Sequence, residues 1–264
     1  MSNPGNRKFL LSKRLDRAFI DLHEFYTFNV SIVREFFSRP FEFKELINQF
    51  YEVGVRSLPL ITLTGFIIGI VFTNQSRPSL KEFGAASWLP SLIAIAIVRA
   101  LGPLVTAIIA AARVSSNMGA EIGSMKVTEQ IDAMEVSASN PFKFLVVTRV
   151  LATTLMVPLL MTYTVLVALL GSYVNVHANE LTSFTTFMTQ VFNAITFLDV
   201  FSSIIKSVVF GYTLGMIGCF KGYYSSKGTE GVGKAANSAV VTAIILIFLE
   251  ELLAMQIINA IRVM

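Results

Sequence analysis

The sequence is short of charge and of the side chains that build catalytic and metal sites. Charged residues make up 14% of its 264 residues, whereas a soluble domain carries about a quarter. The single cysteine, Cys219, excludes an intrachain disulfide. The two histidines, His23 and His177, lie far apart and have no partner residues beside them. We therefore expect no metal site, no catalytic site and no enzymatic activity in this chain.

Hydrophobic residues, in contrast, make up 54% of the chain, and many of them lie in long runs. A membrane-spanning helix needs about 20 mostly apolar residues. Five runs are long enough, at residues 55–73, 88–112, 144–171, 197–220 and 239–261. The sequence predicts an all-α integral membrane protein with a five-span domain over residues 55–264.

Lysine and arginine residues are distributed unequally between the two sides of these spans. Sixteen precede the first span or lie around the segments after the second and fourth spans, and three lie on the opposite side. Basic residues accumulate on the cytoplasmic side of a membrane, so we expect a cytoplasmic N-terminus and a C-terminus outside. Because the basic residues follow the spans, we expect no nucleic-acid partner.

Residues 1–54 are predicted to form amphipathic helices rather than a soluble domain. Phenylalanine-rich helical patterns cover residues 15–37 and 41–55, and Arg39 and Pro40 separate them. Apolar residues recur at helical spacing with charges between them, which is typical of a helix lying in the membrane interface. The alternative is a cytoplasmic helix packed on a partner.

The polar segment "AEIGSMKVTEQIDAMEV", residues 120–136, lies between the second and third apolar runs. Four of its polar residues recur at intervals that place them on one face of an α-helix: Glu121, Thr128, Asp132 and Glu135. A neighbouring apolar stripe consists of Val127, Ile131 and Met134. We expect one helix of about four turns that offers a docking surface. The alternative is an ordinary solvated connector.

A longer pattern, "AARVSSNMGAEIGSMKVTEQIDAMEVSASNPFKFLVVTRVLA", surrounds this segment at residues 111–152. It is accompanied by "ALGPLVTAII", "IIKSVVFGYTLG" and "KGYYSSKGTEGVGKAANSAVV", at residues 100–109, 204–215 and 221–241. These stretches resemble the MlaE-type permease family, the membrane subunits of bacterial lipid ABC transporters associated with MCE-domain proteins. The resemblance extends from about residue 53 to the C-terminus.

The resemblance implies a homodimeric, multi-pass permease in the bacterial inner membrane, with its C-terminus in the periplasm. A separate cytoplasmic ATPase dimer would bind ATP and Mg²⁺, and this chain would hold no cofactor. An MCE-domain protein would receive or deliver phospholipid on the periplasmic side. Residues of about 118–138 would form the coupling helix that docks on the ATPase. Its candidate contact residues are Glu121, Met125, Lys126, Thr128, Glu129, Asp132 and Glu135.

The resemblance also implies a lipid cavity at the outer end of the first two spans. Its candidate apolar lining residues are Phe72, Leu80, Phe83 and Leu101, with Asn74 and Gln75 at the mouth. Arg99 borders the same cavity, but Ala100 replaces the glutamate that usually follows this arginine in the family. We therefore expect Arg99 to be unpaired and able to bind a lipid phosphate with two hydrogen bonds. Ordinary packing is the alternative for each of these residues.

Charged residues within the last two spans are costly in a membrane and usually pair. Asp199 and Lys206 lie seven residues apart in the fourth span, and Glu250 and Glu251 lie midway along the fifth. We expect Lys206 to pair with Glu250 or Asp199, either as a structural ion pair or in substrate handling. An ion-coupled secondary carrier could instead use Asp199, Lys206 and Glu250 as a relay, although the sequence lacks the internal repeat of many carriers. A structural membrane scaffold is a third possibility.

One near-match to a nucleotide-binding motif is rejected. Residues 228–235, "GTEGVGKA", approach the phosphate-binding pattern, but Ala235 stands where the hydroxyl that binds Mg²⁺ is needed. No β-strand is expected before it. We expect a turn at this position, which leaves ATP binding to a separate chain.

Overall fold

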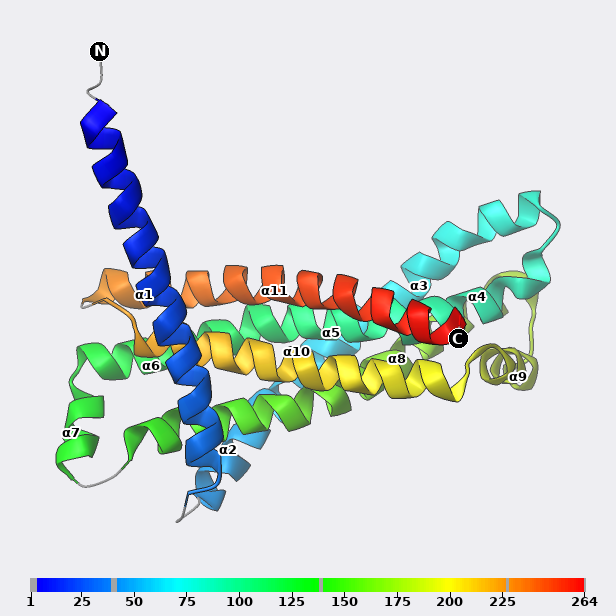
Figure 1. Cartoon of the computed structure of the whole chain (residues 1–264). Helices are drawn as coiled ribbons and strands as arrows, with labels where there is room; N and C mark the ends of the chain where they lie inside the picture. Colours follow the sequence, from blue (N-terminus) through cyan, green and yellow to red (C-terminus); the bar gives the residue numbers. More distant parts are fainter. Residues whose placement is uncertain (1–3, 39–41, 138–139, 227, 264) are drawn as a thin grey trace.

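The computed structural model describes residues 4–38, 42–137, 140–226 and 228–263, with side chains from residue 19 onward except those of residues 21 and 263. Every regular element in these ranges is helical (Figure 1). Within the part of the chain that the structure describes, five helical segments are long and apolar enough to cross a membrane: Phe43–Glu82, Ala86–Val127, Lys143–Glu180, Phe197–Tyr223 and Thr229–Arg262. The predicted all-α, five-span fold is confirmed, and each span extends beyond the apolar run that predicted it.

The N-terminal region forms two helices, α1 (Pro4–Phe36) and α2 (Phe43–Val53). Helix α1 lies across the helical bundle (Figure 1). Phe28 of α1 is buried, and its ring packs edge-on against Phe142 and Phe220, with ring centres 5.1 and 5.3 Å away. Phe19, Leu22 and Tyr26 remain exposed. One face of α1 is thus held by the chain itself, and the location of its other face in a membrane interface stays a prediction.

The first span is a nearly continuous helix. The short helix η1 (Val55–Ser57) connects α2 to α3 (Leu58–Glu82). The second span begins at η2 (Ala86–Trp88) and continues through α4 (Leu89–Ala96), η3 (Ile97–Leu101), α5 (Gly102–Ala110), η4 (Ala111–Ser115) and α6 (Ser116–Val127). Both η3 and η4 are π-helical turns. Such turns are rare in proteins as a whole, and those that occur are often found at functional sites.

The prediction of a single helix over residues 118–138 is wrong. Helix α6 ends at Val127, and α7 (Gln130–Val136) begins in a new direction (Figure 1). Between them, Glu129 adopts a left-handed backbone conformation, with φ of 59°. A left-handed residue interrupts a right-handed helix, so Glu121 of α6 shares no helix face with Asp132 and Glu135 of α7. Residues 138–139, which follow α7, lie outside the described residues.

The third span consists of the π-helical turn η5 (Lys143–Val147) and α8 (Thr148–Glu180). Helix α8 packs against both α3 and α10 (Phe197–Tyr223). The contacts are close because glycines lie in them. A Cβ atom on Gly69 would come within 2.0 Å of the Ala168 carbonyl oxygen, and one on Gly215 within 2.1 Å of Thr153 Oγ1. Small residues thus allow close packing between these helices.

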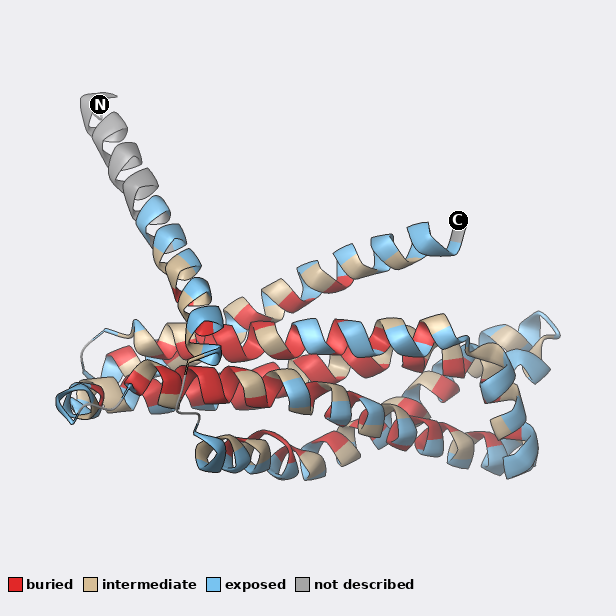
Figure 2. Ribbon diagram, turned by 60° about the horizontal axis from the view of Figure 1, so that its bottom comes forward, coloured by how far each residue is buried: buried red, intermediate tan, exposed pale blue. Residues whose placement is uncertain are grey.

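Burial differs strongly among the spans (Figure 2). In the most apolar stretch of each span, 67% of the residues are buried for the third, but 22% for the first and 11% for the fifth. The fifth span is α11 (Thr229–Val263). Much of α3 and α11 is therefore left for lipid or for another protein to cover.

Helix α9 (Phe184–Ala194) lies between the third and fourth apolar runs, where we predict no helix from the sequence. The Ser183 hydroxyl accepts a hydrogen bond from the Thr186 backbone amide at 3.2 Å and caps the helix. Phe187 and Val191 are buried in one cluster with Leu89 and Ile93 of α4. A serine followed by apolar residues at helical spacing was the available signal.

Candidate functional site

Three of the predicted coupling residues hold α6 to the rest of the bundle, although Glu121 itself is exposed. Glu121 forms an ion pair with Arg149 of α8 at 2.9 Å, and the Arg149 side chain is only 2% exposed. The Lys126 ammonium donates to the Tyr223 carbonyl at the end of α10, at 2.6 Å. Met125 is half-buried and packs on the hydrophobic core. These contacts join the end of α6 to the third and fourth spans.

The other four predicted coupling residues form an exposed acidic turn, which we define as Thr128, Glu129, Asp132 and Glu135. Within the described residues, the three carboxylates take part in no ion pair. Ile131 is buried and Met134 is half-buried against the core, so this part of the apolar stripe faces the chain itself. The acidic turn is therefore accessible to a partner.

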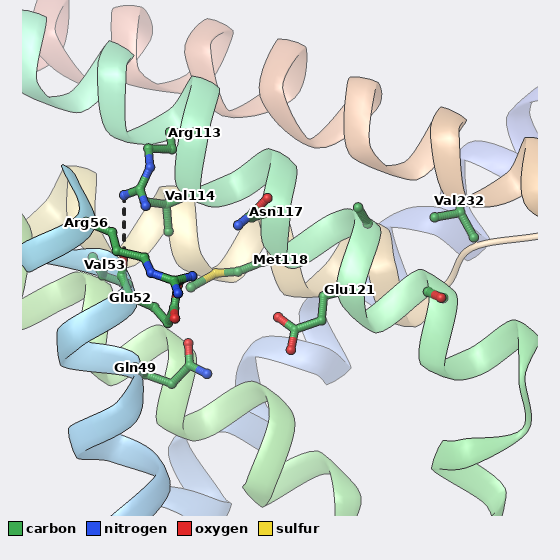
Figure 3. A pocket seen from close by; sticks show the side chains of 12 residues that line it. Gln49, Glu52, Val53, Arg56, Arg113, Val114, Asn117, Met118, Glu121 and Val232 are labelled. Carbon is green, nitrogen blue, oxygen red and sulfur yellow. Dashed lines mark hydrogen bonds and ion pairs between the residues drawn. The ribbon is translucent and has the colours of Figure 1, made fainter. Parts of the chain in front are cut away.

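A pocket of about 580 Å³ lies beside α6, between α2, α6 and the start of α11 (Figure 3). Arg113 of η4 crosses to the first span and donates to the Glu52 carbonyl oxygen at 3.2 Å. Glu52 also pairs with Arg56 at 2.7 Å. The Glu121 carboxylate lies on the opposite wall from these residues (Figure 3). A displacement of α6 would therefore also act on the first span.

Arg99 lies toward the other end of the bundle. It is paired, so the prediction that it is unpaired is wrong. Its Nε lies 2.6 Å from Asp199 Oδ1, and its Nη2 donates to Asp199 Oδ2 at 3.0 Å. Asp199 is 1% exposed and also caps the start of α10 by accepting from the Thr196 amide. Arg262 at the end of α11 pairs with the same carboxylate. The acid that Ala100 does not supply comes from α10, one hundred residues later in the chain.

The prediction that Lys206 pairs with Glu250 or Asp199 is also wrong. The Lys206 ammonium lies 2.8 and 3.0 Å from the two carboxylate oxygens of Glu251. It also donates to the Arg99 carbonyl oxygen in the π-helical turn η3. Glu250 instead accepts a hydrogen bond from Thr213. Successive residues of a helix point about 100° apart, so the acid one residue later faces Lys206.

These contacts make the charged residues a joint between three spans. Ser203 of α10 donates to the Val98 carbonyl at 2.6 Å, beside the Lys206 bond to Arg99. The backbone of η3 is thus held by two side chains of α10, one of which also holds Glu251 of α11. A small cavity of about 140 Å³ adjoins the joint, and its lining includes Arg99, Asp199, Lys206, Asn259 and Arg262.

Only some of the residues predicted to line the outer cavity line a pocket in the structure. Phe72 and Leu80 line a pocket of about 880 Å³ between α3, α4 and α9. Leu101 is half-buried and packs on the neighbouring core, and the Phe83 side chain is fully outside at 84% exposure. Asn74 accepts hydrogen bonds from Arg77 and Asn175, both at 3.0 Å. Gln75 is exposed.

Several residues at these sites were not predicted. Glu251 and Arg262 belong to the charged joint, and Gln190 and Asn193 of α9 line the outer pocket. The sequence indicates that Glu251 is a membrane charge but not that it pairs with Lys206, and it does not indicate the ion pair of Arg262 with Asp199. The two α9 residues could have been found only after α9 itself was recognised.

Comparison with known proteins gives a consistent result. The sequence model of the family described as Permease MlaE matches residues 46–257. A probable ABC transporter permease protein of Rickettsia bellii is 34% identical over 244 residues, which cover 92% of this chain and 94% of the relative. A probable ABC transporter permease protein of Synechocystis is 35% identical over 208 residues, or 79% of each chain. Another from Porphyra purpurea is 37% identical over 198 residues, or 75% of each chain.

Proposed function

The chain belongs to the MlaE permease family, and from this premise we propose that it moves phospholipids as the homodimeric membrane subunit of an ABC transporter. The multi-pass membrane fold and the role of ABC transporter permease are already given by the family and by the five apolar helices. An ATPase partner follows from that role. The substrate, the other partners and the orientation belong to the proposal.

The observation that carries the proposal is the exposed acidic turn between α6 and α7. Its carboxylates are exposed, while the helix that bears it is fixed to α8 by Glu121 and to α10 by Lys126. A charged turn that is anchored through α6 and forms no ion pair among the described residues suits a surface that transmits force from a partner. We propose that it is the coupling element that docks on the cytoplasmic ATPase dimer, which binds ATP and Mg²⁺ in separate chains.

Orientation follows from this assignment. The acidic turn and the start of α11 lie at one end of the bundle, and α9 lies at the other (Figure 1). The basic residues near the α7 end outnumber those near the α9 end, which favours a cytoplasmic α7 end and a C-terminus in the periplasm of a bacterial inner membrane. The α9 end would then face an MCE-domain protein on the periplasmic side.

A phospholipid substrate is supported by the pocket at the α9 end. Phe72, Leu80 and Trp88 give it apolar walls at the outer end of the first two spans. Long acyl chains need such a surface because transferring apolar area out of water is favourable. The low burial of α3 and α11 supports a second copy of the chain that completes the lipid site.

An ion-coupled carrier is a weaker alternative. Its proposed relay of Asp199, Lys206 and Glu250 requires that these groups exchange protons or ions directly. In the structure, Asp199 pairs with two arginines, Lys206 with Glu251, and Glu250 with a threonine. These contacts favour a structural joint over a relay.

The proposal is tested by purifying the native complex from the membrane through a tag on this chain. Mass spectrometry of the subunits should identify an ATPase chain and an MCE-domain protein, and lipid analysis should identify bound phospholipid. A complex that contains the ATPase but no phospholipid would contradict the substrate. Recovery of this chain without an ATPase would contradict the coupling assignment.

A further inference from the structure

Helix α9 forms one wall of the outer pocket. Phe187 and Val191 fix α9 against α4, and the Ser183 cap fixes its first turn. Gln190 and Asn193 lie on the side of α9 that lines the pocket. Side chains on a capped and packed helix are held more precisely than side chains on a loop.

Four of the residues that line this pocket have polar side chains, and we define them as the amide row. The amide row consists of Ser87 and Ser91 from the start of the second span, and of Gln190 and Asn193 from α9. The Gln190 side-chain oxygen is buried and has no hydrogen-bond partner in the described part of the chain. Leaving a buried polar atom unpaired is unfavourable. Rotation of the carboxamide can place either its oxygen or its NH₂ group at this position, so this end of Gln190 is suited to bind a polar group of a ligand.

The chemistry of the lining residues limits the class of ligand that the pocket can bind. None of the described residues that line the pocket is charged. A phosphate or an ammonium group would leave its charge unpaired here. Neutral ester groups fit better, because a carboxamide can turn to present either its oxygen or its NH₂ group, and NH₂ donates to an ester carbonyl. The volume of about 880 Å³ is within the range of about 300–1,000 Å³ that is usual for small-molecule sites.

We propose that α9 is part of the lipid site, and that Gln190 and Asn193 bind the glycerol-ester region of a diacyl lipid whose acyl chain lies along Phe72 and Leu80. This inference rests on the proposed phospholipid transport and extends it. The neutral pocket recognises the ester linkage, whereas the head group lies outside the pocket. Gln190 and Asn193 are thus specificity-determining residues for ester-linked lipid, independent of head-group charge.

The test compares two lipids that differ only at the proposed contact. The purified complex of this chain with its ATPase is exchanged into equal amounts of diester and diether phosphatidylethanolamine, and retained lipid is measured by native mass spectrometry. The wild-type complex should retain the diester form about five- to tenfold more, as expected for the loss of roughly one hydrogen bond. Gln190→Leu and Asn193→Leu should reduce this preference. Thr189→Val, an exposed change on the same helix, should keep it.

Several results separate this inference from the proposed function. A wild-type complex that retains phospholipid without an ester preference would overturn the role of the amide row and leave phospholipid transport standing. A wild-type complex that retains no phospholipid would overturn both. Equal thermal unfolding of the Gln190→Leu and wild-type complexes excludes misfolding as the cause of a lost preference. If Ala194→Trp, which fills the pocket, separated the subunits without reducing lipid retention, the pocket would be a protein interface and the inference would be wrong.

Discussion

The Lys206–Glu251 pair provides a sharp prediction, because a neighbouring acid serves as an internal control. The two side chains are 5% and 11% exposed, so they belong among buried ion pairs rather than surface pairs. Removing one partner of a buried pair costs about 3–5 kcal/mol, whereas an exposed pair contributes at most about 1 kcal/mol. Glu251→Gln should therefore lower the free energy of unfolding by about 3–5 kcal/mol.

The same geometry predicts how a second substitution acts. Replacing both partners with apolar residues removes the unpaired charge, so Lys206→Met combined with Glu251→Leu should recover much of the stability lost in either single variant. Glu250→Gln should cost far less than Glu251→Gln, because it changes one hydrogen bond from Thr213.

The assay is thermal unfolding of the purified protein in detergent. A loss of about 3–5 kcal/mol corresponds to a decrease of roughly 6–20 °C in the unfolding temperature for a chain of this size. A double variant whose loss equals the sum of the two single losses would show that the residues do not interact. A larger effect of Glu250→Gln than of Glu251→Gln would refute the assigned pairing.

Three further predictions concern the coupling turn, the helix packing and α9. Asp132→Lys combined with Glu135→Lys should detach the ATPase in a pull-down while the unfolding temperature stays constant, and Glu82→Lys at the opposite end should leave binding intact; retained ATPase in the double variant would speak against docking at this turn. Gly69→Ala should destabilise the α3–α8 contact by about 1–3 kcal/mol through overpacking, whereas Gly233→Ala, which has open space around it, should be tolerated in the same unfolding assay. Ser183→Ala should weaken α9 by about 1 kcal/mol, seen as faster amide hydrogen exchange over residues 184–194; unchanged exchange would exclude a capping role.

The number and type of membrane helices could be predicted because long apolar runs have few alternatives to a spanning helix. The break at Glu129 could not, because a left-handed conformation in a non-glycine residue has no strong sequence signal. A continuous helical period through residues 120–136 therefore suggested one helix where the chain forms two.

Pairing between spans was predictable in kind but not in identity. The cost of membrane charges indicated that Lys206 needs an acid, but the rotation of α11 about its axis is set by packing. That rotation decides between Glu250 and Glu251. Arg99 likewise finds its acid on a helix distant in sequence, which the local departure at Ala100 could not indicate. Residues of α9 escaped notice because a helix of 11 residues outside the long apolar runs is hard to distinguish from a connecting segment.

The most direct test of the proposed function is lipid movement by the reconstituted complex. The complex is placed in proteoliposomes that contain a labelled phospholipid, and transfer of that lipid is followed with ATP and with a non-hydrolysable analogue. We expect transfer that requires both ATP hydrolysis and the ATPase subunit, and that is lost when Asp132 and Glu135 are both changed to lysine. Transfer by this chain alone, at a rate independent of ATP, would contradict the assignment and favour an ion-coupled carrier.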